Sequence, residues 1–165
     1  MDETLPARVR PADVAGLSLR KARAVATRPD VRGVVLGADT VVVVDGAPLG
    51  KPADPADARH MLRRLRGRVH EVVTGVSVVG AGREATRTVV SRVLMRAYDD
   101  ATIDAYVATG EPLDKAGAYA VQEGGGDLVA AVIGSYSNVV GLPLAVTREL
   151  LAEFDVVTSG PGRPA

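Results

Sequence analysis

The chain has 165 residues, of which 47% are hydrophobic but only 3% aromatic, so it suits one domain with a core of small aliphatic side chains. Twenty basic and twenty acidic residues give a formal net charge of zero, which argues against a nucleic acid polymer or an anionic membrane as partner. The absence of cysteine excludes disulfides and thiolate metal ligands. No apolar run reaches the roughly 20 residues of a membrane span, and we expect a cytoplasmic protein.

The first element predicted is a helix over 13–28. Asp13 is a plausible N-cap, and Leu17, Lys21 and Val25 fall on one face at helical spacing. The proline that follows this stretch is expected to stop the helix.

A strand is predicted next, over 31–45. It is mostly apolar on both faces and so central, with a break or bulge at 37–39, where Gly-Ala-Asp interrupts the apolar run. Asp45-Gly46 is a hairpin signal. A second helix is predicted over 54–67, because an Asp-Pro pair starts it and a glycine ends it.

The second half of the chain predicts two antiparallel strands, a short helix, a loop-rich stretch, a strand and a last helix. These elements cover, in order, 69–79, 84–98, 100–109, 111–126, 128–133 and 142–154. We therefore expect one α/β domain with a mixed sheet over 1–155. The Gly/Pro-rich end, 156–165, is expected to be disordered.

Lysine is scarce in this chain. Only Lys21, Lys51 and Lys115 occur, against seventeen arginines. Lys51 and Lys115 stand in loops bounded by glycine or proline, and a compact ammonium fits a narrow site beside phosphate oxygens better than a flat guanidinium does. Chance placement is the alternative to a phosphate site.

Several further residues carry candidate chemistry. Asp39 stands among apolar strand residues, so it either bonds backbone N–H groups at a bulge or acts as a carboxylate that holds a divalent cation or accepts a proton from water. Gln122 either reads a base edge or is a plain loop residue. The small polar run 134–144 either offers N–H groups to an anion or simply enters a helix. We predict no role for His60, on a charged helix face, or His70, expected at a strand edge.

Five short motifs follow one another in a definite order. They are Leu-Gly-Ala-Asp-Thr-Val-Val (36–42), Leu-Gly-Lys-Pro (49–52), His-Glu-Val-Val-Thr-Gly-Val (70–76), Tyr-Val-Ala-Thr-Gly-Glu-Pro-Leu-Asp-Lys-Ala-Gly-Ala-Tyr (106–119) and Val-Val-Gly-Leu-Pro-Leu (139–144). In this order they resemble the Maf family of nucleoside triphosphate pyrophosphatases, which is related in architecture to the inosine triphosphatase group. The resemblance extends from about Asp2 to Leu151.

The resemblance implies a curved, mixed sheet flanked by helices and hydrolysis of a nucleotide to its monophosphate and pyrophosphate, assisted by Mg²⁺ or Mn²⁺. By the same match Asp39 is the general base, Lys51 and Lys115 are catalytic pocket residues, and Glu3 joins Asp39 in holding the metal. Charge neutralisation by a divalent ion and two lysines agrees with what attack on a polyanion requires.

Thr40 and Gln122 match the positions that tune base choice in the family. This pair resembles the branch that acts on dTTP and UTP, with modified pyrimidine nucleotides as further candidates. The 7-methyl-GTP branch stays open, because Glu123 follows Gln122 and a one-place shift would bring a glutamate to that position. A non-catalytic nucleotide-binding or septum-associated protein is a second alternative, and a homodimer is expected from the family alone.

One family feature is missing from the printed sequence. Members usually begin with a strand and a Ser-x-Ser-x-Arg-Arg loop about thirty residues before an Asp-Glu pair, whereas here Asp2-Glu3 stands at the start and no such loop occurs. Either the gene start has been placed too late or the chain is shortened and its activity uncertain. In the printed sequence the loss of that strand is expected to leave an exposed sheet edge.

Overall fold

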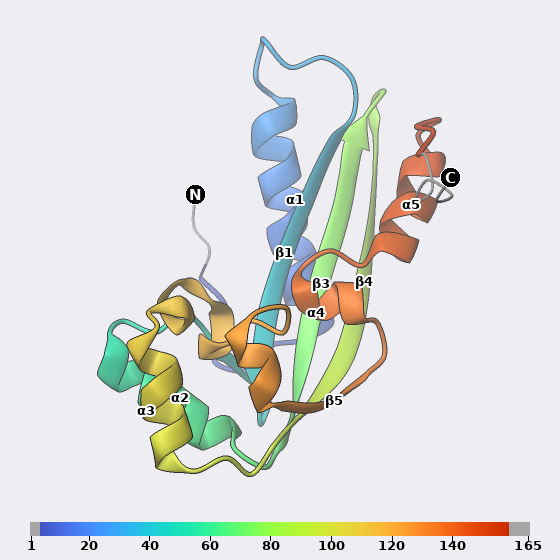
Figure 1. Cartoon of the computed structure of the whole chain (residues 1–165). Helices are drawn as coiled ribbons and strands as arrows, with labels where there is room; N and C mark the ends of the chain where they lie inside the picture. Colours follow the sequence, from blue (N-terminus) through green and yellow to red (C-terminus); the bar gives the residue numbers. More distant parts are fainter. Residues whose placement is uncertain (1–3, 159–165) are drawn as a thin grey trace.

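The computed structural model describes residues 4–158, which form one sheet with helices on both of its faces (Figure 1). The elements, in chain order, are α1 (Pro11–Ala26), β1 (Val35–Val44), β2 (Ala47–Leu49), α2 (Pro55–Leu65), β3 (Val69–Gly80), β4 (Arg83–Met95), α3 (Asp100–Ala108), the 3-10 helices η1 (Glu111–Asp114), η2 (Ala116–Ala118) and η3 (Gly124–Leu128), β5 (Val129–Ile133), α4 (Tyr136–Val140) and α5 (Leu144–Ala152). No helix of this stretch is long and apolar enough to cross a membrane.

Within residues 4–158 the sheet has five strands, in the order β2-β1-β3-β4-β5. The α/β class is confirmed, and so are the helices that flank the sheet. All four pairings are antiparallel, so the part of the sheet within 4–158 lacks the parallel pair that a mixed sheet would contain. The predicted hairpin is confirmed at Asp45 and Gly46, which both have positive φ (54° and 80°), as a two-residue type I′ turn requires.

The bulge predicted at 37–39 is wrong. β1 pairs with β3 in unbroken register from Val35 to Val43. Gly37 serves close packing instead, because a Cβ there would lie 2.6 Å from the Ser18 carbonyl oxygen of α1. Gly75 on β3 leaves the same helix equally little room. The two glycines therefore let α1 lie directly on the sheet.

Alternation along β1 decides which face each side chain takes. Val41 and Val43 pack in a cluster with Val14 of α1, whereas Val42 and Val44 belong to the core beneath α2 and α3. Successive residues of a strand point to opposite faces. The neighbours Asp39 and Thr40, which continue this alternation, are therefore directed to opposite faces of the sheet.

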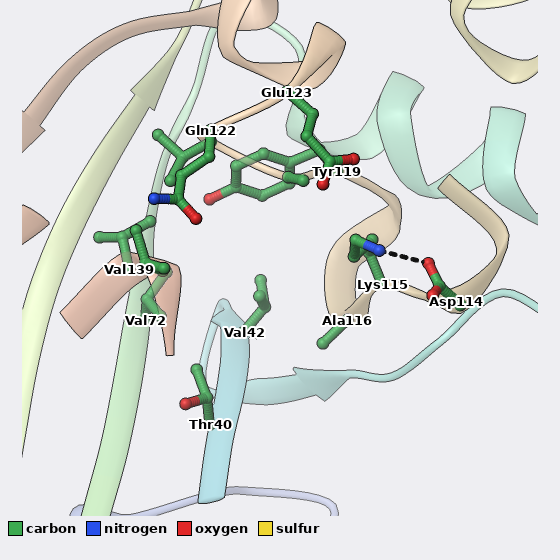
Figure 2. Close-up of a pocket in the computed structure, with 13 residues that line it drawn as sticks. Thr40, Val42, Val72, Asp114, Lys115, Ala116, Tyr119, Gln122, Glu123 and Val139 are labelled. Carbon is green, nitrogen blue, oxygen red and sulfur yellow. Dashed lines mark hydrogen bonds and ion pairs between the residues drawn. The ribbon is translucent and has the colours of Figure 1, made fainter. Parts of the chain in front are cut away.

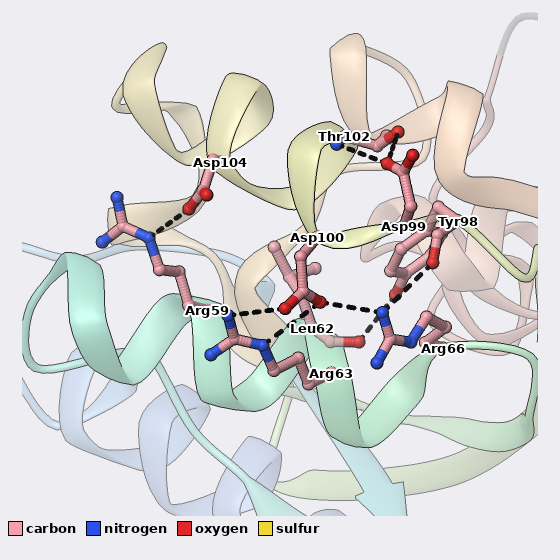
Figure 3. Close-up of polar contacts among 9 residues, drawn as sticks. All are labelled: Arg59, Leu62, Arg63, Arg66, Tyr98, Asp99, Asp100, Thr102 and Asp104. Carbon is pink, nitrogen blue, oxygen red and sulfur yellow. Dashed lines mark hydrogen bonds and ion pairs between the residues drawn. The ribbon is translucent and has the colours of Figure 1, made fainter.

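The helices α2 and α3 pack beside each other (Figure 3) at one end of the sheet (Figure 1). Each begins with an aspartate N-cap, Asp54 and Asp99, whose carboxylate accepts a hydrogen bond of 2.8 Å from the backbone N–H three residues on. Arg63 of α2 and Arg66, which follows the helix at its C-cap, both bind Asp100 of α3. The Asp-Pro start predicted for the second helix is confirmed.

The first helix starts earlier than predicted. It begins at Pro11, and Asp13 lies in its first turn, where its carboxylate accepts the Arg10 backbone N–H at 2.8 Å. A proline at the first helical position explains the shift, because it needs no N–H partner there. The predicted face also ends early, since Val25 is 38% exposed.

The last predicted helix, over 142–154, is confirmed as α5 (Leu144–Ala152), whereas the short helix before it, α4 (Tyr136–Val140), was not predicted. Gly141, with φ of 128°, and Pro143 separate α4 from α5. The strand predicted to end at residue 98 ends at Met95, after a register shift. The predicted tail, 156–165, falls mostly outside the described residues, and its disorder stays a prediction.

Candidate functional site

Two adjoining cavities meet at β1. The first, the Asp39 cavity, has a volume of about 400 Å³, and the second, the Gln122 cavity, about 240 Å³. Thr40 and Ala116 line both. The Asp39 cavity is further lined by Leu5, Leu17, Lys21, Asp39, Val41, Pro48, Leu49, Gly50 and Lys51. The Gln122 cavity is further lined by Val42, Val72, Asp114, Lys115, Tyr119, Ala120, Val121, Gln122, Glu123, Val139 and Val140.

The strand pairing explains why the cavities open at this place. β2 pairs only with Val42–Val44, so no strand within 4–158 covers that side of β1 from Val35 to Val41. This agrees with the exposed edge expected from the sequence. Asp39 and Thr40 stand on the uncovered stretch, and their alternate directions serve the two cavities.

Asp39 forms an ion pair with Lys21 of α1, between Oδ1 and Nζ. The two side chains are 16% and 31% exposed, so the pair is largely shielded from water. The prediction that a carboxylate in this strand needs a partner is confirmed, but the partner is a lysine and no bulge is involved. Asp39 stands in the middle of β1, and close packing of α1 on Gly37 holds the helix against it.

Lys21 is a residue of this cavity that the sequence reasoning missed. Lysine is scarce in this chain, and Lys21 shares a helix face with Leu17, which also lines the Asp39 cavity. The pairing itself could not be foreseen, because Lys21 and Asp39 are 18 positions apart on different elements.

Lys51 is exposed and lines the same cavity as Asp39. It follows β2 in a loop that is fixed by a hydrogen bond of 2.9 Å from the Gly117 N–H to the Gly50 carbonyl. The structure therefore brings together the acid and one of the two predicted loop lysines.

Lys115 lines the adjoining Gln122 cavity (Figure 2). Its Nζ donates to Asp114 Oδ1 at 2.6 Å. This hydrogen bond raises the pKa of Lys115 and lowers the pKa of Asp114. Lys115 thus lines the cavity that adjoins the Asp39 cavity, and among the residues that the structure describes Thr40 and Ala116 are shared by the two.

The Gln122 cavity combines apolar walls with several polar groups. Figure 2 shows Gln122 above Val42, Val72 and Val139, with Thr40 at the far end. The Thr40 hydroxyl lies 2.9 Å from the Thr74 hydroxyl and 3.2 Å from the Gly141 carbonyl oxygen. Its hydrogen bonds are therefore used within the protein, and it holds the backbone beyond α4 in place.

His70 is not the strand-edge residue expected. β3 lies between β1 and β4, and His70 is only 3% exposed. Its Nε2 is 2.8 Å from the hydroxyl of Tyr119, a lining residue of the Gln122 cavity. Burial lowers the pKa of His70 to about 4. The imidazole is therefore neutral near pH 7, and its hydrogen bond helps to hold Tyr119 in the cavity wall.

The anion site considered for 134–144 is not supported, because side chains already bind several of its backbone donors. The Ser135 N–H donates to the Ser91 hydroxyl at 3.0 Å, and the Leu144 N–H to the Ser137 hydroxyl at 3.1 Å. The run is a capped helix entry.

Acidic metal ligands are few in the part of the chain that the structure covers. No group of three or more His, Asp or Glu side chains gathers there into a metal site. Asp39, the first predicted ligand, contributes its carboxylate to the Asp39 cavity. Glu3, the second predicted ligand, lies outside the described residues.

The comparisons with known proteins agree with the motifs. The sequence profile described as Maf-like protein matches residues 1–154. The chain is 49% identical over 148 residues to the dTTP/UTP pyrophosphatase of Symbiobacterium thermophilum, an alignment that covers 88% of this chain and 76% of that protein. It is 52% identical over 159 residues to the dTTP/UTP pyrophosphatase of Moorella thermoacetica, covering 94% and 81%. With the dTTP/UTP pyrophosphatase of Shewanella oneidensis it shares 51% over 123 residues, covering 74% and 63%.

Proposed function

The chain belongs to the Maf family, and we propose from this premise that it is a nucleoside triphosphate pyrophosphatase that hydrolyses dTTP and UTP to the monophosphate and pyrophosphate. The three relatives compared above carry that activity in their names. One structural observation supports it most: Asp39, Lys21 and Lys51 line one cavity, which adjoins the valine-walled cavity of Gln122.

The reaction needs a base and a leaving pyrophosphate. A water oxygen bonds to the α-phosphorus while the bond from that phosphorus to the oxygen bridging to the β-phosphorus breaks. Asp39 accepts the proton that the water loses, and such acid–base assistance typically contributes 10²–10⁴-fold. Its place in the Asp39 cavity, with one oxygen held by Lys21, supports this role.

The lysines neutralise charge on the triphosphate. In this proposal Lys51 contacts phosphate oxygens from the rim, and Lys21 supplies a second positive charge beside Asp39. Lys115 reaches the phosphates from the Gln122 cavity and exchanges Asp114 for a phosphate oxygen as it does so. This exchange is plausible physically because Asp114 is 74% exposed and its pair with Lys115 is screened by water.

A divalent cation, Mg²⁺ or Mn²⁺, belongs to the proposal. Mg²⁺ in phosphoryl-transfer sites is commonly held by one or two carboxylates together with substrate phosphates, so an all-protein cage is not needed. Asp39 suits this mode, since only its Oδ1 is used by Lys21. Glu3 stays a second predicted ligand. When bound, the ion neutralises phosphate charge and polarises the phosphorus–oxygen bonds.

The Gln122 cavity takes the base. An amide offers both a donor and an acceptor, which match the alternating carbonyl and N–H groups along the edge of uracil or thymine. The valine walls suit the apolar faces of the ring and the thymine methyl group. Thr40 acts through the Gly141 backbone that it holds, and modified pyrimidines that keep the same edge are further candidates.

The homodimer and the cytoplasmic location are also part of this proposal and rest on the resemblance. Gel filtration with light scattering measures the first directly. A mass near twice 17.1 kDa is expected.

Product analysis tests the proposed activity. The purified chain is incubated with dTTP, UTP or 7-methyl-GTP in Mg²⁺ or Mn²⁺, and nucleoside monophosphate, pyrophosphate and orthophosphate are measured separately. We expect equal amounts of monophosphate and pyrophosphate from dTTP and UTP. Release of orthophosphate would contradict the bond assignment. Preference for 7-methyl-GTP would favour the other branch, and binding of UTP without turnover would favour the non-catalytic alternative.

A further inference from the structure

Glu111 of η1 binds three hydrogen-bond donors. Its Oε1 accepts the Tyr106 hydroxyl at 2.6 Å and the Gly125 N–H at 3.1 Å, and its Oε2 accepts the Gly124 N–H at 3.1 Å. Glu111 itself does not line either cavity. Hydrogen bonds to an ionised carboxylate are stronger than those between neutral groups, so three at one carboxylate fix its surroundings firmly.

The three donors belong to the frame of the Gln122 loop. The Tyr106 hydroxyl, besides donating to Glu111, accepts the Ala120 N–H at 3.3 Å. The backbone is thus held before Gln122 at Ala120 and after it at Gly124, by groups that meet at one carboxylate. Gln122 and Glu123 lie on the short span between these anchors.

The backbone around Gly124 and Gly125 is closely packed. A Cβ at Gly125 would lie 2.6 Å from the Tyr106 hydroxyl and 2.7 Å from the Ala120 carbonyl oxygen. A Cβ at Gly124 would lie 3.1 Å from Glu111 Oε2. Tyr106 is 7% exposed, and burial together with Glu111 raises the pKa of its hydroxyl, so the hydroxyl remains a donor at neutral pH. The loop backbone at Gly124 and Gly125 is therefore packed closely on Tyr106, Glu111 and Ala120.

We infer that Glu111 is a positioning residue for base selection: through Tyr106 and the two glycine N–H groups it sets where the Gln122 amide stands in the cavity. This inference rests on the proposed function, since it concerns the same base site. A loop without this anchor places the amide less accurately, and a displaced amide binds the pyrimidine edge more weakly. Asp39, Lys21 and Lys51, which face the reacting phosphate in the proposed function, lie on other elements and are little affected.

The test compares Glu111→Gln with a matched acid-to-amide control, Asp104→Asn. Asp104 is exposed on α3, pairs with Arg59 and lines neither cavity. In Glu111→Gln the amide nitrogen cannot accept an N–H, so one glycine donor loses its partner. We expect KM for UTP to rise about tenfold with kcat within threefold of wild type, and the preference for UTP over CTP to fall by a similar factor. Asp104→Asn keeps the wild-type values.

Tyr106→Phe provides a second variant, since it removes the link to Ala120 and leaves Glu111 in place. We expect the same change in KM and selectivity, and a double variant that is less than additive. Wild-type selectivity in both single variants, or a loss confined to kcat, would overturn the role assigned to Glu111. If the wild type fails to hydrolyse UTP, the proposed function fails, but calorimetric binding of UMP against CMP still decides on Glu111.

Discussion

α1 packs on the sheet at Gly37 and carries Lys21 into the Asp39 cavity, so a change in this packing should move Lys21. The variant Gly37→Ala tests this coupling between packing and the site. The added Cβ would lie 2.6 Å from the Ser18 carbonyl oxygen and 2.8 Å from the Ala22 backbone nitrogen, whereas ordinary contacts begin at 3.4 Å. Both obstacles are backbone atoms and cannot rotate away. The helix must therefore move outward by about 0.8 Å, the difference between 3.4 and 2.6 Å, and it takes Lys21 with it.

The added methyl group should lower both the stability and the rate. Overpacking of a well-packed interior costs about 1–3 kcal/mol, and we expect the free energy of unfolding to fall by about that amount. A displacement near 1 Å of a group that positions substrate can cost on the order of 10²-fold in rate. We therefore expect kcat/KM for dTTP to fall at least about tenfold in Gly37→Ala, because Lys21 no longer meets Asp39 in the same geometry.

Gly16→Ala is the matched control on the same helix. Its Cβ would meet only the flexible end of Arg20, at 3.3 Å. Alanine in a helix interior is about 0.5–1 kcal/mol more favourable than glycine, so this variant gains stability and keeps its rate. Urea unfolding and steady-state pyrophosphate release measure both effects. Equal stability of Gly37→Ala and wild type would refute the packing argument, and an unchanged kcat/KM in a destabilised variant would refute the coupling.

Two further predictions concern titration and charge. The pKa of His70 is about 4 in the folded state and near 6.5 in the unfolded state, so between these pH values only the unfolded state binds the proton. The free energy of unfolding therefore falls by about 3 kcal/mol as pH drops from 6.5 to 4. His70→Gln should lose this part of the pH dependence in urea unfolding, whereas the exposed His60→Gln should keep it. Lys21→Met should lower kcat/KM for dTTP at least about tenfold, while Arg20→Met, on the exposed side of α1, should not, and equal rates in both would contradict the role of Lys21.

Local signals in the sequence placed most elements correctly, because each has a local physical cause. Asp45-Gly46 tolerates positive φ, and Asp54 caps a helix that a proline starts. Gly37 was misread as a bulge because a bulge and a close helix contact both call for glycine. The choice between them depends on where α1 packs, which is a tertiary fact.

The site was foreseen in part. Asp39 and Lys51 do line one cavity, and Lys115 with Gln122 the next, as the scarcity of lysine and the motifs suggested. Lys21 was missed because its partner comes from another element. His70 was misjudged because alternation predicts a strand but not its place in the sheet.

The most direct measurement of the central claim is the rate of pyrophosphate release from dTTP by Asp39→Asn. Asp45→Asn is the control, since Asp45 stands in the hairpin turn after β1, pairs with Arg68 and lines neither cavity. We predict a loss of about 10²–10⁴-fold in kcat for Asp39→Asn with folding intact by circular dichroism, and a wild-type rate for Asp45→Asn. Full activity of a folded Asp39→Asn variant would contradict the account.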